Sequence, residues 1–167
     1  MKTIATFLLC VFGTSASAED WIYNVSKDEF TDAETRIAMS FSPYDRSRYG
    51  DTIALFIGCS PSGFYSGVIW EESVVPTYQS MSADVLMRAG ENPTITLEAD
   101  VIGARNEMTY FYDSDSRRVL TELQDAAARS ATVILGVETV SDLRLTARFE
   151  MNGFHEAAAG VLEFCAE

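Results

Sequence analysis

The sequence predicts an α+β domain in which a mostly antiparallel sheet, or a sandwich, carries two helices late in the chain. Most segments alternate apolar and polar residues, which is the period of a strand with one buried face. The period changes to that of an amphipathic helix over residues 116–127 and again over 154–165. Strands that precede a late pair of helices are typical of α+β domains.

The first two thirds of the chain is read as strands joined by turns. The expected strands are 21–25 (an edge strand), 37–42, 52–59, 64–70, 83–88, 95–101 and 108–112. Residues 60–63 are Ser-Pro-Ser-Gly, a turn composition, so the two strands beside them are predicted to form a hairpin.

The last third contains both helices. Acidic and hydroxyl residues at 113–116 are expected to cap the first helix and to complement its dipole. Residues 131–137 are apolar on both faces, which predicts a central strand covered on two sides. A strand at 143–149 follows, and Asn152 is predicted as the N-cap of the helix at 154–165.

Residues 1–18 have the pattern of a secretory signal peptide. A short basic start precedes a nine-residue apolar run, and Ala16-Ser17-Ala18 is a small-x-small cleavage site. The mature chain is expected to begin at Glu19 and to form one globular domain over 19–167. This pattern predicts a periplasmic or secreted protein.

Two cysteines remain once Cys10 leaves with the signal peptide. Cys59 ends an alternating run on its apolar side, and Cys165 lies on the apolar stripe of the last helix. In an oxidising compartment, two thiols that face one core are expected to form a disulfide. Such a bond closes a loop of about 106 residues, which contributes about 4–5 kcal/mol. The alternative is two separate buried thiols.

The mature chain is strongly acidic. Removal of residues 1–18 takes away Lys2 and no acidic residue, so 11 basic and 25 acidic residues give a net charge of −14. Nucleic acid and anionic membranes bind basic patches, so neither is expected as a partner. No apolar run after residue 18 is long enough to span a membrane.

Residues for covalent catalysis are scarce. His155 is the single histidine, and a Gly-x-Ser-x-Gly elbow and a phosphate-binding glycine loop are both missing. The start of a calcium loop at 113–116 is followed by Arg117, where a third oxygen ligand belongs. The sequence therefore predicts no catalytic residues, no metal site and no cofactor.

Two aromatic features are consistent with different functions, sugar hydrolysis and partner binding. Glu71 and Glu72 follow Trp70, and two carboxylates beside an aromatic platform are the minimal equipment of a glycoside hydrolase. Tyr110, Phe111 and Tyr112 place aromatic rings on both faces of one strand, which is either covered on both sides or presents one face to a partner. Tyr110, Tyr112 and Trp70 are the candidate partner-binding residues.

Several positions together resemble the TagO/VasI family of small periplasmic proteins associated with type VI secretion. They are Trp21, Cys59, Arg88, the helix at 116–127, the Phe-Glu-Met-Asn-Gly run at 149–153 and the terminal Cys165. The resemblance covers nearly the whole mature chain. It implies an exported accessory protein, and it implies no catalytic residues.

The expected function is that of an exported, non-enzymatic accessory or binding protein of the periplasm, with a protein partner. The resemblance adds an association with type VI secretion. A secreted or phage-derived inhibitor of an envelope enzyme is the alternative, and a small glycan hydrolase is a third reading.

Overall fold

One curled antiparallel sheet forms the body of the molecule. The computed structural model describes residues 20–29, 31–47, 50, 52–74, 82–139 and 144–166. Its strands are β1 (Trp21–Lys27), β2 (Glu34–Arg46), β3 (Thr52–Ser60), β4 (Gly63–Ile69), β5 (Ser82–Ala89), β6 (Ile95–Ile102), β7 (Met108–Phe111), β8 (Val133–Glu138) and β9 (Arg144–Phe149). The helices are α1 (Asp113–Ala128) and α2 (Phe154–Cys165).

The strand order across the sheet is β1-β2-β3-β4-β7-β6-β5-β8-β9, and all neighbours are antiparallel. The predicted α+β class is confirmed, with one sheet rather than a sandwich. The hairpin of β3 and β4 is confirmed as well, with Ser60 paired to Gly63. The predicted signal peptide at 1–18 lies outside the described residues.

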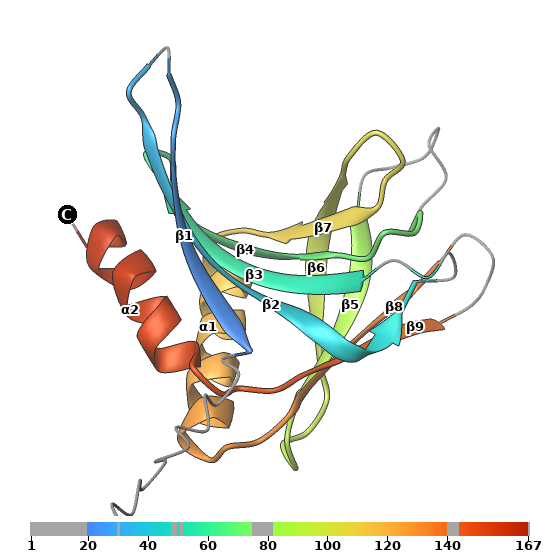
Figure 1. The fold of residues 1–167 in the computed structure, drawn as a ribbon. Coiled ribbons are helices and arrows are strands. Elements are labelled where there is room, and N and C mark those ends of the chain that lie inside the picture. The colour runs from blue at the N-terminus through green and yellow to red at the C-terminus, as the bar shows by residue number, and fades with distance from the viewer. Residues whose placement is uncertain are drawn as a thin grey trace, which may run out of the picture.

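The sheet curls until its last strand approaches its second (Figure 1). The backbone N–H of Arg148 in β9 donates to Asp45 Oδ2 of β2 at 2.8 Å, and Arg148 Nη1 donates to Asp45 Oδ1 at 2.7 Å. The pairing of β2 with β3 shifts between Phe41 and Arg46. Such an irregularity bends a strand, which here turns the end of β2 toward β9.

Both helices pack on the inner face of the curled sheet, and the core lies between them and the strands (Figure 1). Alternate residues of β3 illustrate the pattern, since Ile53, Leu55 and Ile57 are fully buried on this face. The helices contribute Val119, Leu123 and Ala126 from α1 and Phe154, Ala157, Ala158 and Val161 from α2. Among the described residues, no helix is long and apolar enough to cross a membrane.

Cys59 and Cys165 are bonded, as the sequence predicted, with their Cα atoms 5.7 Å apart. The bond joins the end of β3 to the last turn of α2. At the other end of α2, the rings of Trp21 and Phe154 meet edge to face at 4.9 Å, and the Trp21 indole N–H donates to the carbonyl of Glu150. The first strand, the third strand and the last helix are thus fastened together.

Both predicted helix starts need correction. Asn152 does not cap α2, because Gly153 takes the N-cap position with a left-handed φ of 78° and no side chain caps the helix. Asn152 donates instead to Asp20 Oδ2 at 2.9 Å. The other helix, α1, begins at Asp113 rather than 116, with no side-chain cap. Asp113 and Asp115 therefore lie inside its first turn, where they complement the dipole.

The strand predicted at 131–137 is confirmed as β8, which pairs with β5 on one side and β9 on the other, but its predicted coverage on both faces is wrong. Strand β8 lies next to the edge strand β9, and Ile134 is half-buried on the outer face. Gly136 is another outer-face residue of β8, and it lies next to Arg144 and Thr146 of β9. Apolar residues on both faces therefore did not indicate a second covering layer.

The buried hydroxyls of the inner face differ in whether they are hydrogen-bonded. The indole N–H of Trp70 donates to Thr109 Oγ1 at 3.0 Å. The hydroxyls of Ser66 and Ser116 are 2.9 Å apart and join β4 to α1. The hydroxyl of Ser40 has no hydrogen-bond partner among the described residues, although Ser40 is fully buried.

Loss of the disulfide is expected to lower stability markedly. The separation of 106 residues corresponds to about 4–5 kcal/mol if the bond acts by restricting the unfolded chain. We expect Cys59→Ser, Cys165→Ser and the double variant to lose similar free energy of unfolding in urea titrations. Two free thiols in unreduced wild-type protein, measured by mass spectrometry, would contradict the structure.

Ser40 and Ser66 make a matched pair for a second test. Ser40→Ala removes a hydroxyl that makes no hydrogen bond, so stability is expected to stay equal or to rise by up to about 1 kcal/mol. Ser66→Ala leaves the Ser116 hydroxyl unpaired and is expected to cost about 1–3 kcal/mol. Urea denaturation of both variants measures the difference, and a larger loss for Ser40→Ala would show that its hydroxyl has a partner.

Candidate binding surface on the outer face of the sheet

Apolar and aromatic side chains continue across the outer face, on the side away from both helices. In one row, Ile22 is paired with Met39, Met39 with Phe56, Phe56 with Gly67 and Gly67 with Tyr110. Successive side chains of a strand alternate between faces, so the neighbouring rows share this face. We call the set the outer apolar face: Ile22, Ile37, Met39, Phe41, Phe56, Tyr65, Ile69, Met108, Tyr110 and Tyr112.

Two glycines make room for the aromatic rings of this face. A Cβ on Gly58 would lie 2.5 Å from the Tyr65 ring, and a Cβ on Gly67 would lie 2.5 Å from both the Phe56 ring and the Thr109 carbonyl oxygen. Glycine weakens a strand, but an aromatic ring from the neighbouring strand can cover it. The rings of Phe56 and Tyr65 therefore lie across the sheet.

Four aromatic rings form one cluster, on β3, β4, β7 and at Tyr112, which directly follows β7. Phe56 meets Tyr65 at 6.2 Å and Tyr110 at 5.1 Å, both with steeply inclined planes. Tyr110 is nearly parallel to Tyr65 at 5.8 Å and to Tyr112 at 6.1 Å. Such pairs stabilise one another beyond simple burial, so the cluster is a fixed surface.

Burial decreases along this cluster. Phe56 is 3% exposed, Tyr65 and Tyr110 are partly buried, and Tyr112 is 48% exposed. Burial raises the pKa of Tyr65, and repulsion from an ionised Tyr110 raises it further. Burial also raises the pKa of Tyr110, with a smaller contribution from Tyr112. Tyr65 and Tyr110 are therefore uncharged at neutral pH.

The outer apolar face ends in exposed carboxylates on β6 and β5. Asp100 is paired with Tyr110 across the strands, and Asp84 stands opposite Glu98. All three side chains are exposed, and none forms an ion pair with a described residue. Like charges that face each other across a sheet are unfavourable, so a cation placed here would relieve the repulsion.

The structure brings together only part of the predicted recognition residues. Tyr110 and Tyr112 lie side by side on the outer face, while Phe111 between them is fully buried in the core. Trp70 is fully buried on the inner face, with its N–H bonded to Thr109. It has no accessible surface for a partner or a sugar, so its prediction as a binding residue is corrected.

The carboxylates after Trp70 do not stand beside an exposed aromatic ring. Glu71 pairs with Arg105 at 3.3 Å, and Glu72 is buried. Among the described residues, no group of three or more His, Cys, Asp or Glu side chains is placed to hold a metal ion. His155 is exposed near the start of α2, with its ring against that of Phe154.

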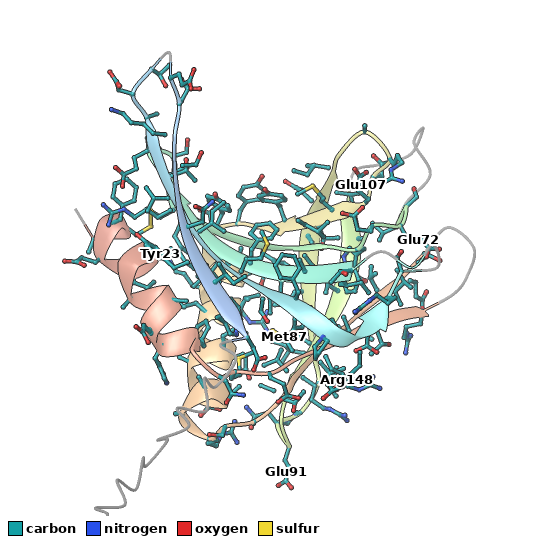
Figure 2. The ribbon with its side chains drawn as sticks, in the orientation of Figure 1. Tyr23, Glu72, Met87, Glu91, Glu107 and Arg148 are labelled. Carbon is teal, nitrogen blue, oxygen red and sulfur yellow. A yellow bond between two sulfur atoms is a disulfide. The ribbon has the colours of Figure 1, made fainter. Side chains whose placement is uncertain are left out.

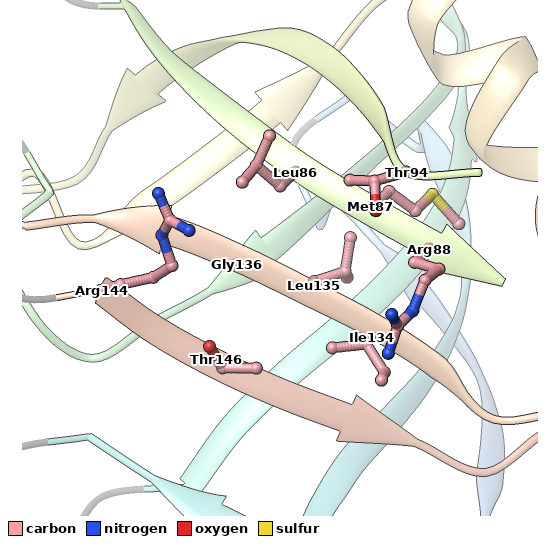
Figure 3. Close-up of a pocket in the computed structure, with 9 residues that line it drawn as sticks. All are labelled: Leu86, Met87, Arg88, Thr94, Ile134, Leu135, Gly136, Arg144 and Thr146. Carbon is pink, nitrogen blue, oxygen red and sulfur yellow. The ribbon is translucent and has the colours of Figure 1, made fainter. Parts of the chain in front are cut away.

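A hollow on the other half of the outer face has a different character (Figure 3). It lies over Gly136, with Arg88 at one side and Arg144 at the other. Arg144 pairs with Glu138 at 2.9 Å. This basic edge at β5, β8 and β9 is distinct from the aromatic cluster, and the sequence analysis did not predict it.

Sequence reasoning also missed Phe56 and Tyr65 as members of the surface. The available signal was the alternation of Phe56 with the core residues Leu55 and Ile57, together with Gly58 and Gly67 on flanking positions. The pairing of each glycine with a ring depends on strand register, which the sequence did not provide.

The raised tyrosine pKa values predict how stability changes in alkali. Each native pKa lies above the ordinary value of 10.0, so the unfolded chain loses these protons first. The stabilisation is complete below pH 10 and is lost as pH rises through the native pKa values. We expect the free energy of unfolding to fall less steeply above about pH 10 in Tyr65→Phe/Tyr110→Phe than in wild type. Tyrosinate absorbance during titration measures the same groups, and identical curves for both proteins would contradict the prediction.

Comparisons of the chain with protein-family models, with curated proteins and with solved structures find no match. The resemblance to the TagO/VasI family therefore stays a prediction from the residues named above. A function has to be argued from the surfaces that the fold presents.

Proposed function

We propose that this protein is a non-enzymatic binding protein of an oxidising compartment outside the cytoplasm, and that it binds another protein through its outer apolar face. The observation that carries the proposal is the exposure of large apolar side chains on that face. Ile22, Phe41 and Tyr112 are 56%, 45% and 48% exposed. The disulfide supports the compartment, because such bonds persist where thiols are oxidised.

The form of this surface favours a protein partner. Contiguous exposed apolar patches mark interaction sites, and tyrosine is enriched among the residues that dominate binding energy. Tyr112 is anchored against Tyr110, so little side-chain freedom would be lost when a partner covers it. The Tyr112 ring is thus already positioned before a partner binds.

The negative charge beside the aromatic cluster indicates which kind of protein would bind there. Asp84, Glu98 and Asp100 border the aromatic cluster, and the mature chain has a net charge of −14. A partner with apolar side chains beside a basic patch would match both features. Electrostatic steering would speed the encounter, so the association rate would fall as salt rises.

The resemblance to the TagO/VasI family suggests a component of a secretion apparatus as this partner. An inhibitor of an envelope enzyme would use the same surface, and the identity of the captured protein separates the two. The hydrolase reading is less supported, because the ring expected as a sugar platform belongs to the buried Trp70.

The test is photo-crosslinking in intact cells of the native host, with the cross-linker placed at Met39 on the outer apolar face. Tyr112→Ala is expected to weaken capture of the partner at least tenfold, or by about 1.4 kcal/mol or more. The fold should be unchanged by circular dichroism, because the ring is half exposed. His155→Gln is the control, since His155 is an exposed residue of α2, and its capture should equal that of wild type.

Two outcomes would defeat the proposal. One is a correctly folded Tyr112→Ala protein that captures as much partner as wild type. The other is the absence of any captured protein, together with hydrolysis of a wall glycan by the purified protein.

A further inference from the structure

The two edges of the sheet differ in whether another strand lies against them. At β9, the end of β2 lies alongside, and Asp45 accepts hydrogen bonds from the Arg148 backbone and guanidinium. Arg148 is seen in Figure 2 on the side where these strands approach each other. At the opposite edge, β2 is the only described strand that pairs with β1. One side of β1 is therefore free within the described part of the chain.

Strand β1 lacks the features that usually protect an edge. Natural edge strands carry proline, inward-pointing charges or bulges, or they are short or covered. Over its seven residues, β1 has no proline, and its pairing with β2 is regular from Trp21 to Lys27. Lys27, its one charged residue, is at its end and pairs with Asp32. An unprotected edge of this kind accepts another strand.

The free edge also exposes apolar side chains on both of its faces. Ile22 is 56% exposed on the outer face, while Tyr23 and Val25 are 39% and 47% exposed on the side of α2. A docking strand places alternate side chains on these two faces. A strand docked on β1 would therefore contact apolar side chains on both faces.

Helix α2 forms the second wall of a groove beside this edge. The groove is lined by Trp21, Ile22, Tyr23, Glu156 and Ala157. Tyr23 lies between β1 and α2 (Figure 2), and a Cβ on Gly160 would come within 2.7 Å of its ring. Glycine destabilises a helix relative to alanine, and here it allows the ring to lie against the helix.

The helix wall is acidic. Glu156, Gly160 and Glu163 fall at i, i+4 and i+7, so they share one side of α2, and Gly160 places that side next to Tyr23. Both glutamates are exposed, and neither pairs with a basic described residue. Positively charged side chains on a docked strand would meet them.

We propose that β1 and α2 form a docking groove for an extended segment of another protein, which adds a strand to the free edge of β1. The segment alternates apolar side chains with lysine or arginine, so that its basic residues face Glu156 and Glu163. This mode differs from the proposed contact on the outer apolar face, because backbone hydrogen bonds supply affinity and the groove supplies specificity. The two surfaces share Ile22, but the open edge of β1 and the facing side of α2 belong to this groove alone.

The probe is an acetylated and amidated heptapeptide of alternating lysine and valine, matched to the seven residues of β1. A second peptide has the same side chains but is methylated on every backbone nitrogen, so it cannot pair as a strand. Fluorescence anisotropy should show saturable binding of the first peptide to the full protein and at least tenfold weaker binding of the second. Hydrogen exchange should slow at residues 22–26 when the first peptide binds.

Matched charge variants locate the site. Glu156→Gln/Glu163→Gln should weaken peptide binding severalfold. Asp84→Asn/Glu98→Gln removes the same charge from exposed positions of the outer face and should leave it unchanged. Tyr112→Ala should also leave it unchanged, which keeps this test separate from that of the proposed function.

Several results would overturn the proposal. They are equal affinity for the methylated peptide, an equal loss in the outer-face variant, or no saturable binding below about 1 mM. Sedimentation velocity tests a second copy as the occupant. A wild-type dimer that dissociates in Val25→Lys, with no binding of the peptide, would show that β1 pairs with itself.

Discussion

The packing of the last helix on the inner face of β1, β2 and β3 is the contact on which the rest of the structure depends. The helix is held at its start by the contact of Phe154 with Trp21 and at its end by the disulfide to Cys59. Between these points, the Arg36 guanidinium lies 4.5 Å from the centre of the Phe164 ring. Because α2 is the final element, the first strand, the third strand and the chain end are secured together.

This arrangement determines which surfaces remain available. The inner face of the curled sheet is covered by α1 and α2, so its aromatic residues, Trp70 and Phe111 among them, are committed to the core. Neither of the helices in the described part of the chain covers the outer face (Figure 1). Its cohesion comes from rings that lie over glycines, as Tyr65 does over Gly58. These contacts between aromatic rings and glycines thus hold the strands together and also create an apolar surface.

Charge is placed at the borders of the apolar regions. Asp84, Glu98 and Asp100 flank the aromatic cluster, and Glu156 lines the groove beside β1. Exposed acidic residues keep an apolar surface hydrated in the free protein and attract a basic partner over a distance set by salt. An acidic chain with apolar patches can thus stay dissolved and remain selective in what it binds.

The sequence by itself determined the features that depend on local periodicity. Alternation in 52–59 and helical spacing in 154–165 located β3 and α2, and the facing directions of Cys59 and Cys165 predicted their bond. Tyr110 and Phe111 were correctly predicted to point to opposite faces of one strand, because side-chain alternation is a property of the strand alone. Tyr112, predicted in the same strand, lies just after β7 at the N-cap position of α1. These inferences needed no knowledge of neighbouring strands.

Only the tertiary structure decided how the strands lie against one another. Strand β7 is placed between β4 and β6, and this pairing turns Trp70 inward while Tyr110 joins Phe56 and Tyr65 outside. The curl that brings Asp45 to Arg148 leaves β1 as the open edge. Register and curvature arise from contacts between residues far apart in the chain, and local periodicity carries no information about which distant strands will meet.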